Sequence, residues 1–378
     1  MSKPNAGTLR EVAAVFFRLG LLAFGGPAAH IAMMEDEVVR KRQWMTPEHF
    51  LDLIGATNLI PGPNSTEMTM HCGHERAGLP GLVVAGLAFI LPAVVITAGF
   101  AWLYQQYGHL PQAAPFVYGI PPAVIAIILG AAYTLGRKAL KSSWLAVLGA
   151  ATLVAALLGL NEIVALLGAG AVGVLGHLLR NPPAPGKAAR LLPLLALPAG
   201  PLAESSSAGG IFWTFLKVGA TLYGSGYVLF AFLEGELVAR GWLSRQQLLD
   251  AIAVGQFTPG PVLSSATFVG WQLDGLRGAA LATVGIFLPS FVFVLVLNPL
   301  LPRLRRSKLF SVFLDSVNVA SVALIAAVLV TMSRAALTDW RTVLIASLSL
   351  AVTFVYKKLN SAFVVLGGAL LGYLLTLA

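Results

Sequence analysis

Residues 58–67 of this chain read Asn-Leu-Ile-Pro-Gly-Pro-Asn-Ser-Thr-Glu, and residues 256–265 read Gln-Phe-Thr-Pro-Gly-Pro-Val-Leu-Ser-Ser. Each stretch holds a Pro-Gly-Pro triplet, formed by Pro61, Gly62 and Pro63 in the first and by Pro259, Gly260 and Pro261 in the second. A continuous helix cannot accommodate such a triplet, because proline lacks an N–H group and its ring clashes with the preceding turn. The sequence therefore predicts two helix breaks at related positions.

The surroundings of the two triplets also match. Phe17-Arg18-Leu19-Gly20 corresponds to Leu216-Lys217-Val218-Gly219, Glu35 and Glu37 to Glu234 and Glu236, Asp52 to Asp250, and Leu91-Pro92 to Leu288-Pro289. The separation between matched residues drifts only from 199 to 197 along the chain. We interpret residues 1–180 and 211–378 as two related repeats, joined by a linker at 181–210 in which proline and glycine stop helices.

The composition is that of a membrane protein. Of the 378 residues, 57% are hydrophobic and 11% are charged, whereas about 25% of the residues in a soluble domain are charged. We therefore expect an all-α polytopic membrane protein. The net charge of +9 comes mostly from short loops, where it reflects membrane topology rather than nucleic-acid binding. Cys72 is the only cysteine, which excludes an internal disulfide bond and a cysteine-based metal site.

Ten segments are long and apolar enough to cross a hydrocarbon core of ~30 Å. They lie near 12–34, 79–104, 115–136, 143–160 and 162–179 in the first repeat, and near 211–233, 278–299, 310–332, 341–356 and 361–377 in the second. Each repeat is thus expected to have about five transmembrane helices.

The two arms that flank each Pro-Gly-Pro turn are too short to cross a membrane. Each arm spans about 15 Å as a helix, which is half a bilayer. Each pair is therefore either a re-entrant hairpin or one broken crossing, and its irregular backbone must lie inside the protein or line a wet cavity. Loop charge favours the hairpin, because it places Arg40, Lys41 and Arg42 on the same side as most other basic residues. The two repeats then have inverted topology, with both termini outside.

Arg18 and Lys217 lie at matched positions inside the first predicted span of each repeat. A cation at membrane depth costs at least ~2.5 kcal/mol on insertion scales, so it usually faces the protein interior and has a function. The alternative is that each side chain extends to the nearby membrane interface. Because the two positions match, we favour a functional role, and the sign of the charge indicates an anionic substrate.

The residues after each triplet resemble the start of a helix. Small polar residues follow the prolines: Asn64, Ser65 and Thr66 in the first repeat and Ser264 and Ser265 in the second. Exposed N–H groups and the positive end of the helix dipole make a helix N-terminus an anion site. The alternative is that these residues are ordinary caps that satisfy their own backbone.

The first span of each repeat is interrupted by small residues: Gly25 and Gly26 in the first, and Gly224 and Ser225 in the second. Glycine permits an unwound stretch near a ligand or tight packing between helices, and both interpretations stay open.

Other candidate residues have weaker signals. Asn58 and Gln256 precede the triplets and could bind substrate or hold the turns. Coupling or gating roles are open to Glu35, Glu37, Glu234, Glu236, Asp52, Asp250, Glu67 and His30.

Taken together, these residues resemble the chromate ion transporter family. The first repeat carries Phe24-Gly25-Gly26-Pro27, Glu35, Glu37, Trp44 and the first triplet, and the second carries Gly224-Ser225-Gly226, Glu234, Glu236, Trp242 and residues 256–261. The likeness covers nearly the whole chain and is strongest in residues 11–100 and 211–295. It is to the form of the family in which both domains are fused.

The resemblance implies a secondary transporter in the inner membrane of a bacterium or archaeon. It implies export of chromate, driven by membrane potential or a proton gradient, with sulfate as a related ligand. We expect no enzymatic activity, cofactor, metal or nucleic-acid partner, and the sequence leaves a homodimer open. One alternative is a transporter of sulfate or another oxyanion. The other is a membrane-embedded enzyme acting on lipid phosphate, which would need a nucleophile or metal cluster placed once rather than paired polar sites.

Overall fold

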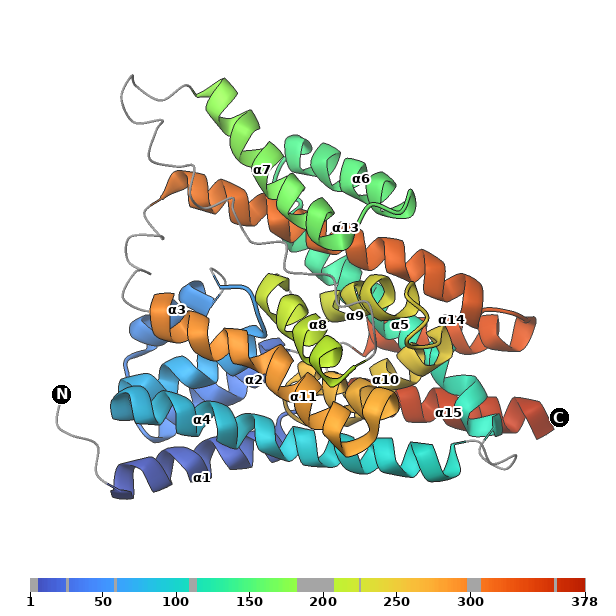
Figure 1. The fold of residues 1–378 in the computed structure, drawn as a ribbon, viewed down its shortest axis with the longest axis horizontal. Coiled ribbons are helices and arrows are strands. Elements are labelled where there is room, and N and C mark those ends of the chain that lie inside the picture. The colour runs from blue at the N-terminus through green and yellow to red at the C-terminus, as the bar shows by residue number, and fades with distance from the viewer. Residues whose placement is uncertain are drawn as a thin grey trace.

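The computed structural model describes residues 6–24, 27–57, 60–108, 114–181, 207–223, 226–297, 307–356 and 359–377. These residues form helices and connecting turns, with no strand among them (Figure 1). The helices of the first repeat are α1 (Ala6–Leu22), α2 (Pro27–Met34), η1 (Glu35–Lys41), α3 (Pro47–Thr57), α4 (Asn64–Tyr107), α5 (Ala114–Ala139), α6 (Ser143–Leu157) and α7 (Glu162–Arg180). Those of the second repeat are α8 (Ala208–Thr221), α9 (Val228–Leu233), η4 (Glu234–Val238), α10 (Arg245–Phe257), η5 (Val262–Ser264), α11 (Ser265–Leu297), α13 (Lys308–Ala336), α14 (Trp340–Val355) and α15 (Ser361–Leu377).

The architecture is that of an all-α, multi-pass membrane protein. Within the described residues, five helices are long and apolar enough to cross a membrane: Asn64–Tyr107, Pro115–Ala139, Glu162–Arg180, Val262–Val296 and Lys308–Ala336. Shorter apolar helices lie at Ser143–Leu157, Trp340–Val355 and Ser361–Thr376. Large apolar side chains such as Val147 and Phe363 are exposed on these shorter helices, as expected where a helix faces lipid.

The first predicted span of each repeat is broken where the sequence predicted an interruption. α1 ends at Leu22 and α2 begins at Pro27, while α8 ends at Thr221 and α9 begins at Val228. Both second pieces continue into a π-helical turn, η1 or η4. Each first span is therefore a discontinuous helix rather than one straight rod.

α4 and α11 each reverse direction near their beginning. The backbone leaves helical geometry at Ala77 and Gly78 in α4 and at Asp274 and Gly275 in α11. A Cβ atom at Gly73 would lie 2.5 Å from the Ala85 side chain. Twelve residues of straight helix span about 18 Å, so this contact requires the chain to fold back on itself. Each helix thus consists of a short arm after the Pro-Gly-Pro turn and a long arm that follows the reversal.

The arms on either side of the first Pro-Gly-Pro turn also lie side by side. His49, near the start of α3, lies 3.3 Å from Glu75, near the end of the short arm of α4. A single broken crossing would separate these residues by more than 30 Å at 1.5 Å per residue. The two arms of the first pair therefore form a helical hairpin. In the second repeat, Asp250 of α10 and Trp271 of α11 both contact the far end of α4, at Tyr104 and Gln105.

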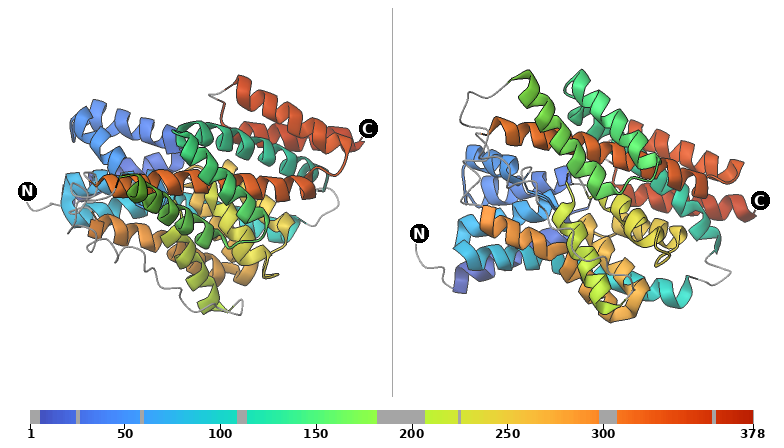
Figure 2. Two further views of the ribbon diagram at one scale, coloured as in Figure 1. Left: turned by 90° about the horizontal axis from the view of Figure 1, so that it is seen from above. Right: turned by 45° about the horizontal axis from the view of Figure 1, so that its top comes forward.

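The two repeats are interlocked. α5 of the first repeat packs against α14 and α15 of the second, and α13 of the second packs against α6 and α7 of the first. Figure 2 shows the green α6 and α7 lying beside the red α13. The long arms of α4 and α11 pack against each other and run in opposite directions (Figure 1). The core is therefore built from both repeats and does not divide at the linker.

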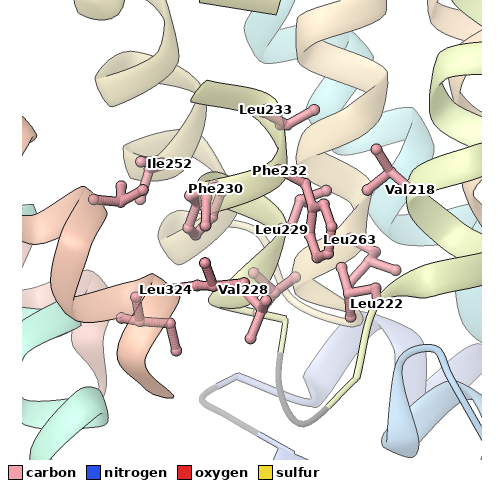
Figure 3. Close-up of a cluster of buried hydrophobic side chains, with 14 of the residues drawn as sticks. Val218, Leu222, Val228, Leu229, Phe230, Phe232, Leu233, Ile252, Leu263 and Leu324 are labelled. Atoms are coloured by element: carbon pink, nitrogen blue, oxygen red, sulfur yellow. The ribbon is translucent and has the colours of Figure 1, made fainter. Parts of the chain in front are cut away.

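The second repeat supplies the most deeply buried part of this core. All six residues of α9, Val228–Leu233, are buried. Figure 3 shows Phe230 and Phe232 of α9 among Ile252 of α10 and Leu324 of α13. This apolar cluster anchors α9 and α10 against α13, and α10 also packs against α5.

Candidate functional site

The two Pro-Gly-Pro turns make reciprocal contacts between the repeats. The N–H of Gly62 donates to the carbonyl of Leu222 at 2.7 Å, and the N–H of Gly260 donates to the carbonyl of Ala23 at 2.8 Å. Ala23 and Leu222 occupy matched positions where α1 and α8 end, so both carbonyls are available to accept a hydrogen bond. Both glycines have positive φ, 137° and 89°, a conformation that side chains disfavour. Each turn is thus docked on the broken first span of the other repeat.

Close backbone contacts hold this crossing together. A Cβ atom at Gly20 of α1 would lie 2.6 Å from the Phe89 carbonyl oxygen of α4. A Cβ atom at Gly219 of α8 would overlap the Ile286 carbonyl oxygen of α11. Only glycine lets each first span touch the backbone of the neighbouring long arm. These two contacts position the carbonyl groups that receive the turns.

Helices begin directly after both turns, as the sequence predicted. α4 begins at Asn64, and the short helix η5 begins at Val262 and leads into α11. The N–H of Thr66 donates to the Pro63 carbonyl at 2.8 Å, which closes the first turn of α4. The positive ends of two helix dipoles therefore lie at the two turns.

Buried hydroxyl groups satisfy one another at the second turn. Thr97 Oγ1 lies 3.3 Å from both Thr258 Oγ1 and Ser264 Oγ. Ser265 donates to a backbone carbonyl three residues earlier, at 2.8 Å. These hydrogen bonds stabilise the second turn.

The first turn differs, because its buried polar groups are not satisfied. Ser65, Thr66 and Glu67 of α4 are buried, and so is Ser290 of α11. Thr66 Oγ1, Ser290 Oγ and both carboxylate oxygens of Glu67 form no well-aligned hydrogen bond within the described part of the chain. An unsatisfied buried polar group costs ~1–3 kcal/mol, so this cluster is a candidate site for a ligand, a proton or water.

The matched cations Arg18 and Lys217 have different surroundings. Lys217 Nζ lies 2.5 Å from Glu236, whose other oxygen lies 2.8 Å from Arg240. Arg18 is exposed on α1, beside the exposed Phe17, and has no ion pair among the described residues. Lys217 is thus neutralised in this conformation, while Arg18 keeps a free positive charge at the helix surface.

The four glutamates that border the predicted loops all form ion pairs. Glu35 pairs with Arg40 at 3.3 Å, Glu37 with Arg42 at 3.1 Å, Glu234 with Arg245 at 2.6 Å, and Glu236 with Lys217 and Arg240. In η1, the hydrogen bond from Lys41 holds the pKa of Asp36 below its ordinary value. The two π-helical turns are therefore charged clusters in both repeats.

The matched aspartates also differ. Asp250 is buried and accepts hydrogen bonds from Tyr104 at 2.6 Å and from Gln246 at 3.0 Å. Asp52 is exposed on α3. Lys217 pairs with Glu236, so Asp250 and Lys217, although both lie in the second repeat, belong to separate polar contacts.

The remaining candidates are buried polar residues or lie outside the described residues. His30 is buried and packs its ring edge against Phe89 at 5.9 Å. Gln256 is buried beside the Tyr227 hydroxyl. No group of three or more metal-ligating side chains is present in the described part of the chain. The predicted roles of Gly25, Gly26, Asn58, Gly224 and Ser225 concern residues outside the described ranges.

Sequence reasoning missed two polar residues of the first turn. Ser290 lies within 2.5 Å of a Cβ atom built on Gly62, and Tyr223 lies near the carboxyl of Glu67. Both carried a signal, because Ser290 follows the matched Leu-Pro pair where the first repeat has Ala93, and Tyr223 corresponds to Phe24. A polar residue in only one repeat indicates a function that symmetry does not require.

A family model and several known proteins that resemble this chain all carry the description of chromate transport. A family model described as chromate transporter matches residues 10–174 and 209–373. The chain is 33% identical to a probable chromate transport protein of Synechococcus elongatus, covering 97% of this chain and 95% of that protein. It is 32% identical to a chromate transport protein of Cupriavidus metallidurans (97% and 92% covered) and 34% identical to one of Pseudomonas aeruginosa (96% and 92% covered). No solved structure matches the chain.

Proposed function

Because the chain belongs to the chromate transporter family, we propose that it exports chromate from the cytoplasm across the inner membrane as a secondary transporter. Its substrates are small tetrahedral oxyanions, of which chromate is the one the family indicates. The membrane potential, a proton gradient or both drive export.

The observation that carries this proposal is the reciprocal docking of the two Pro-Gly-Pro turns. Gly62 and Gly260 bind the carbonyl groups at the breaks of the opposite repeat, at 2.7 and 2.8 Å. Two discontinuous helices and two helix N-termini therefore meet at one crossing, the arrangement that binds substrate in transporters built from inverted repeats. The opposite directions of the long arms of α4 and α11 support inverted topology (Figure 1).

The electrostatics fit an anion that leaves the cell. Moving one charge through a potential of 100 mV changes the free energy by ~2.3 kcal/mol, so a divalent anion leaving a negative interior gains ~4.6 kcal/mol. Arg18 supplies a free positive charge. Lys217 supplies a second one when its ion pair with Glu236 breaks and it binds the substrate instead. A uniporter would therefore already favour export.

The direct test is chromate flux in proteoliposomes with an imposed membrane potential, with sulfate as competitor. We expect chromate to leave the compartment with negative potential. Flux of sulfate in preference to chromate would reassign the substrate within the oxyanions. Turnover of a lipid phosphate without anion flux would instead support the membrane-embedded enzyme.

Loss of both matched cations is expected to lower the flux strongly. In the Arg18→Ala, Lys217→Ala double variant, we expect the initial rate of chromate transport to fall at least about tenfold, which corresponds to ~1.4 kcal/mol of lost attraction. The control is Arg10→Ala, which removes an exposed cation from the same helix α1. Equal rates in the double variant and in wild type, at equal reconstituted protein, would show that the two cations do not attract the substrate.

A further inference from the structure

The first Pro-Gly-Pro turn holds a buried acid that has no counterpart in the second repeat. The Glu67 side chain is fully buried, while its matched residue is Ser265, whose hydroxyl is bound to its own backbone. Glu67 and Ser290 both lie against Gly62, and Tyr223 lies near the same carboxyl. The matched positions of Ser290 and Tyr223 hold Ala93 and Phe24. Three polar side chains thus meet at the first turn, whereas the matched positions hold a satisfied serine and two apolar residues.

No lysine or arginine of the described part of the chain forms an ion pair with Glu67, and the Ser290 hydroxyl lies beside its carboxyl. The titratable groups around it are Tyr223 from the break after α8, His71 one turn further along α4, and His30 on α2, which packs against α4. An ionised carboxylate is costly to bury without a cation, whereas the protonated acid requires only hydrogen bonds. The closed turn therefore holds Glu67 with its proton.

Glu67 also occupies the place where an anion would bind. It lies in the first turn of α4, and its carboxyl is against Gly62 at the positive end of the helix dipole. An ionised carboxylate there would repel an oxyanion and compete with it for that end of the helix. A protonated carboxyl removes the repulsion and presents an O–H donor. Binding of the oxyanion and binding of the proton therefore favour each other.

We propose that Glu67 is the proton-binding residue of the transport cycle and that one proton travels with each oxyanion. This inference rests on the function proposed above. When the turn opens to water and the oxyanion leaves, the O–H bond of the carboxyl breaks. The proton passes to water, and the carboxylate keeps the electron pair until it takes up a proton from the side that binds the next oxyanion. The net charge moved per chromate is then one negative charge instead of two. Of the two driving forces given above, this cycle uses the membrane potential, because a proton gradient directed into the cell opposes a proton that leaves with the oxyanion.

The test measures the distribution of labelled chromate across proteoliposomes that carry a pH gradient, with the membrane potential held at zero. Both compartments are kept alkaline, so that chromate itself carries no proton. For one coupled proton, the chromate ratio at equilibrium changes about tenfold per pH unit, and chromate moves in the direction of the proton gradient. In Glu67→Gln, which is permanently neutral, we expect slower chromate exchange, and we expect the chromate ratio reached at equilibrium to lose its response to the pH gradient. Glu48→Gln, an exposed acid on the other arm of the same hairpin, is the matched control and should respond like wild type.

The outcomes separate the two proposals. Chromate flux in wild type that ignores the pH gradient or runs against it would overturn the role of Glu67 and leave the proposed function standing. A Glu67→Gln variant that responds to the pH gradient like wild type would also overturn the role of Glu67 and leave the proposed function standing. No chromate flux in wild type at any potential would overturn the proposed function itself. If Glu67→Gln does not fold, Ser290→Ala, which removes the hydroxyl facing the carboxyl, is expected to shift the pH at which exchange is half-maximal. An unchanged pH dependence would count against the proposal.

Discussion

Replacing Gly219 with alanine is expected to destabilise the protein and to reduce chromate flux to background. The added Cβ atom would overlap the Ile286 carbonyl oxygen, which belongs to the backbone of α11 and cannot rotate away as a side chain could. Overpacking of this kind costs ~1–3 kcal/mol, occasionally more. Because Leu222 directly follows α8 and its carbonyl holds the first Pro-Gly-Pro turn, moving α8 away from α11 also displaces the site.

The matched control for this prediction lies on the same helix. A Cβ atom at Gly209 meets nothing within 4 Å, and alanine is favoured over glycine in a helix by ~1 kcal/mol. Gly209→Ala should therefore unfold at the same temperature as wild type or higher. The measurement is the midpoint of thermal unfolding of both variants in detergent, followed by flux after reconstitution. Equal unfolding midpoints for Gly219→Ala and wild type would show that α8 and α11 can move apart without loss of stability.

The sequence predicts much of this fold because its strongest signals are local. Proline and glycine at 61–63 and 259–261 break helices wherever they occur, and the small residues after Ala23 and Leu222 interrupt the first spans. The repeated spacing shows that these breaks belong together. The positions of these breaks do not depend on which helices pack side by side, so they can be predicted from the sequence alone.

Partners that come from distant segments are harder to predict. The exchange of α5 and α13 between the repeats leaves no local signal, since both helices are apolar and similar in length. Lys217 has several acids at comparable separation in the sequence, and only the fold selects Glu236. The matched residue Glu37 binds Arg42 instead, which leaves Arg18 exposed. Symmetry in the sequence therefore predicts positions better than it predicts contacts.

α3 and the short arm of α4 form the first hairpin, and α10 and the short arm of α11 form the second. The two hairpins are similar in sequence but are packed differently in the structure. Leu51 of α3 is 66% exposed, whereas its matched residue Leu249 of α10 is 1% exposed. α10 packs against α5 and α15, while α3 packs against α4 and η1. In Figure 1 the yellow α9 and α10 lie within the molecule and the blue α3 lies at one end. We infer that one hairpin is docked and the other undocked, and that transport exchanges these two arrangements between the repeats.

Linking α4 to α10 is expected to stop transport. Tyr104 of α4 donates a hydrogen bond to Asp250 of α10 at 2.6 Å, and this contact must break if the second hairpin leaves its docked position. In a Tyr104→Cys, Asp250→Cys variant, a short thiol cross-linker should reduce chromate flux to background, and cleavage of the linker should restore it. The native Cys72 is buried and should not react.

The control joins two arms that we expect to move together. His49 and Glu75 lie 3.3 Å apart within the first hairpin, so the same cross-linker in a His49→Cys, Glu75→Cys variant should leave most of the flux intact. Full flux with complete linkage of positions 104 and 250 would show that the second hairpin stays docked throughout the cycle. In that case the exposed first hairpin alone would have to open the site, and the similarity of the two repeats would serve folding rather than transport.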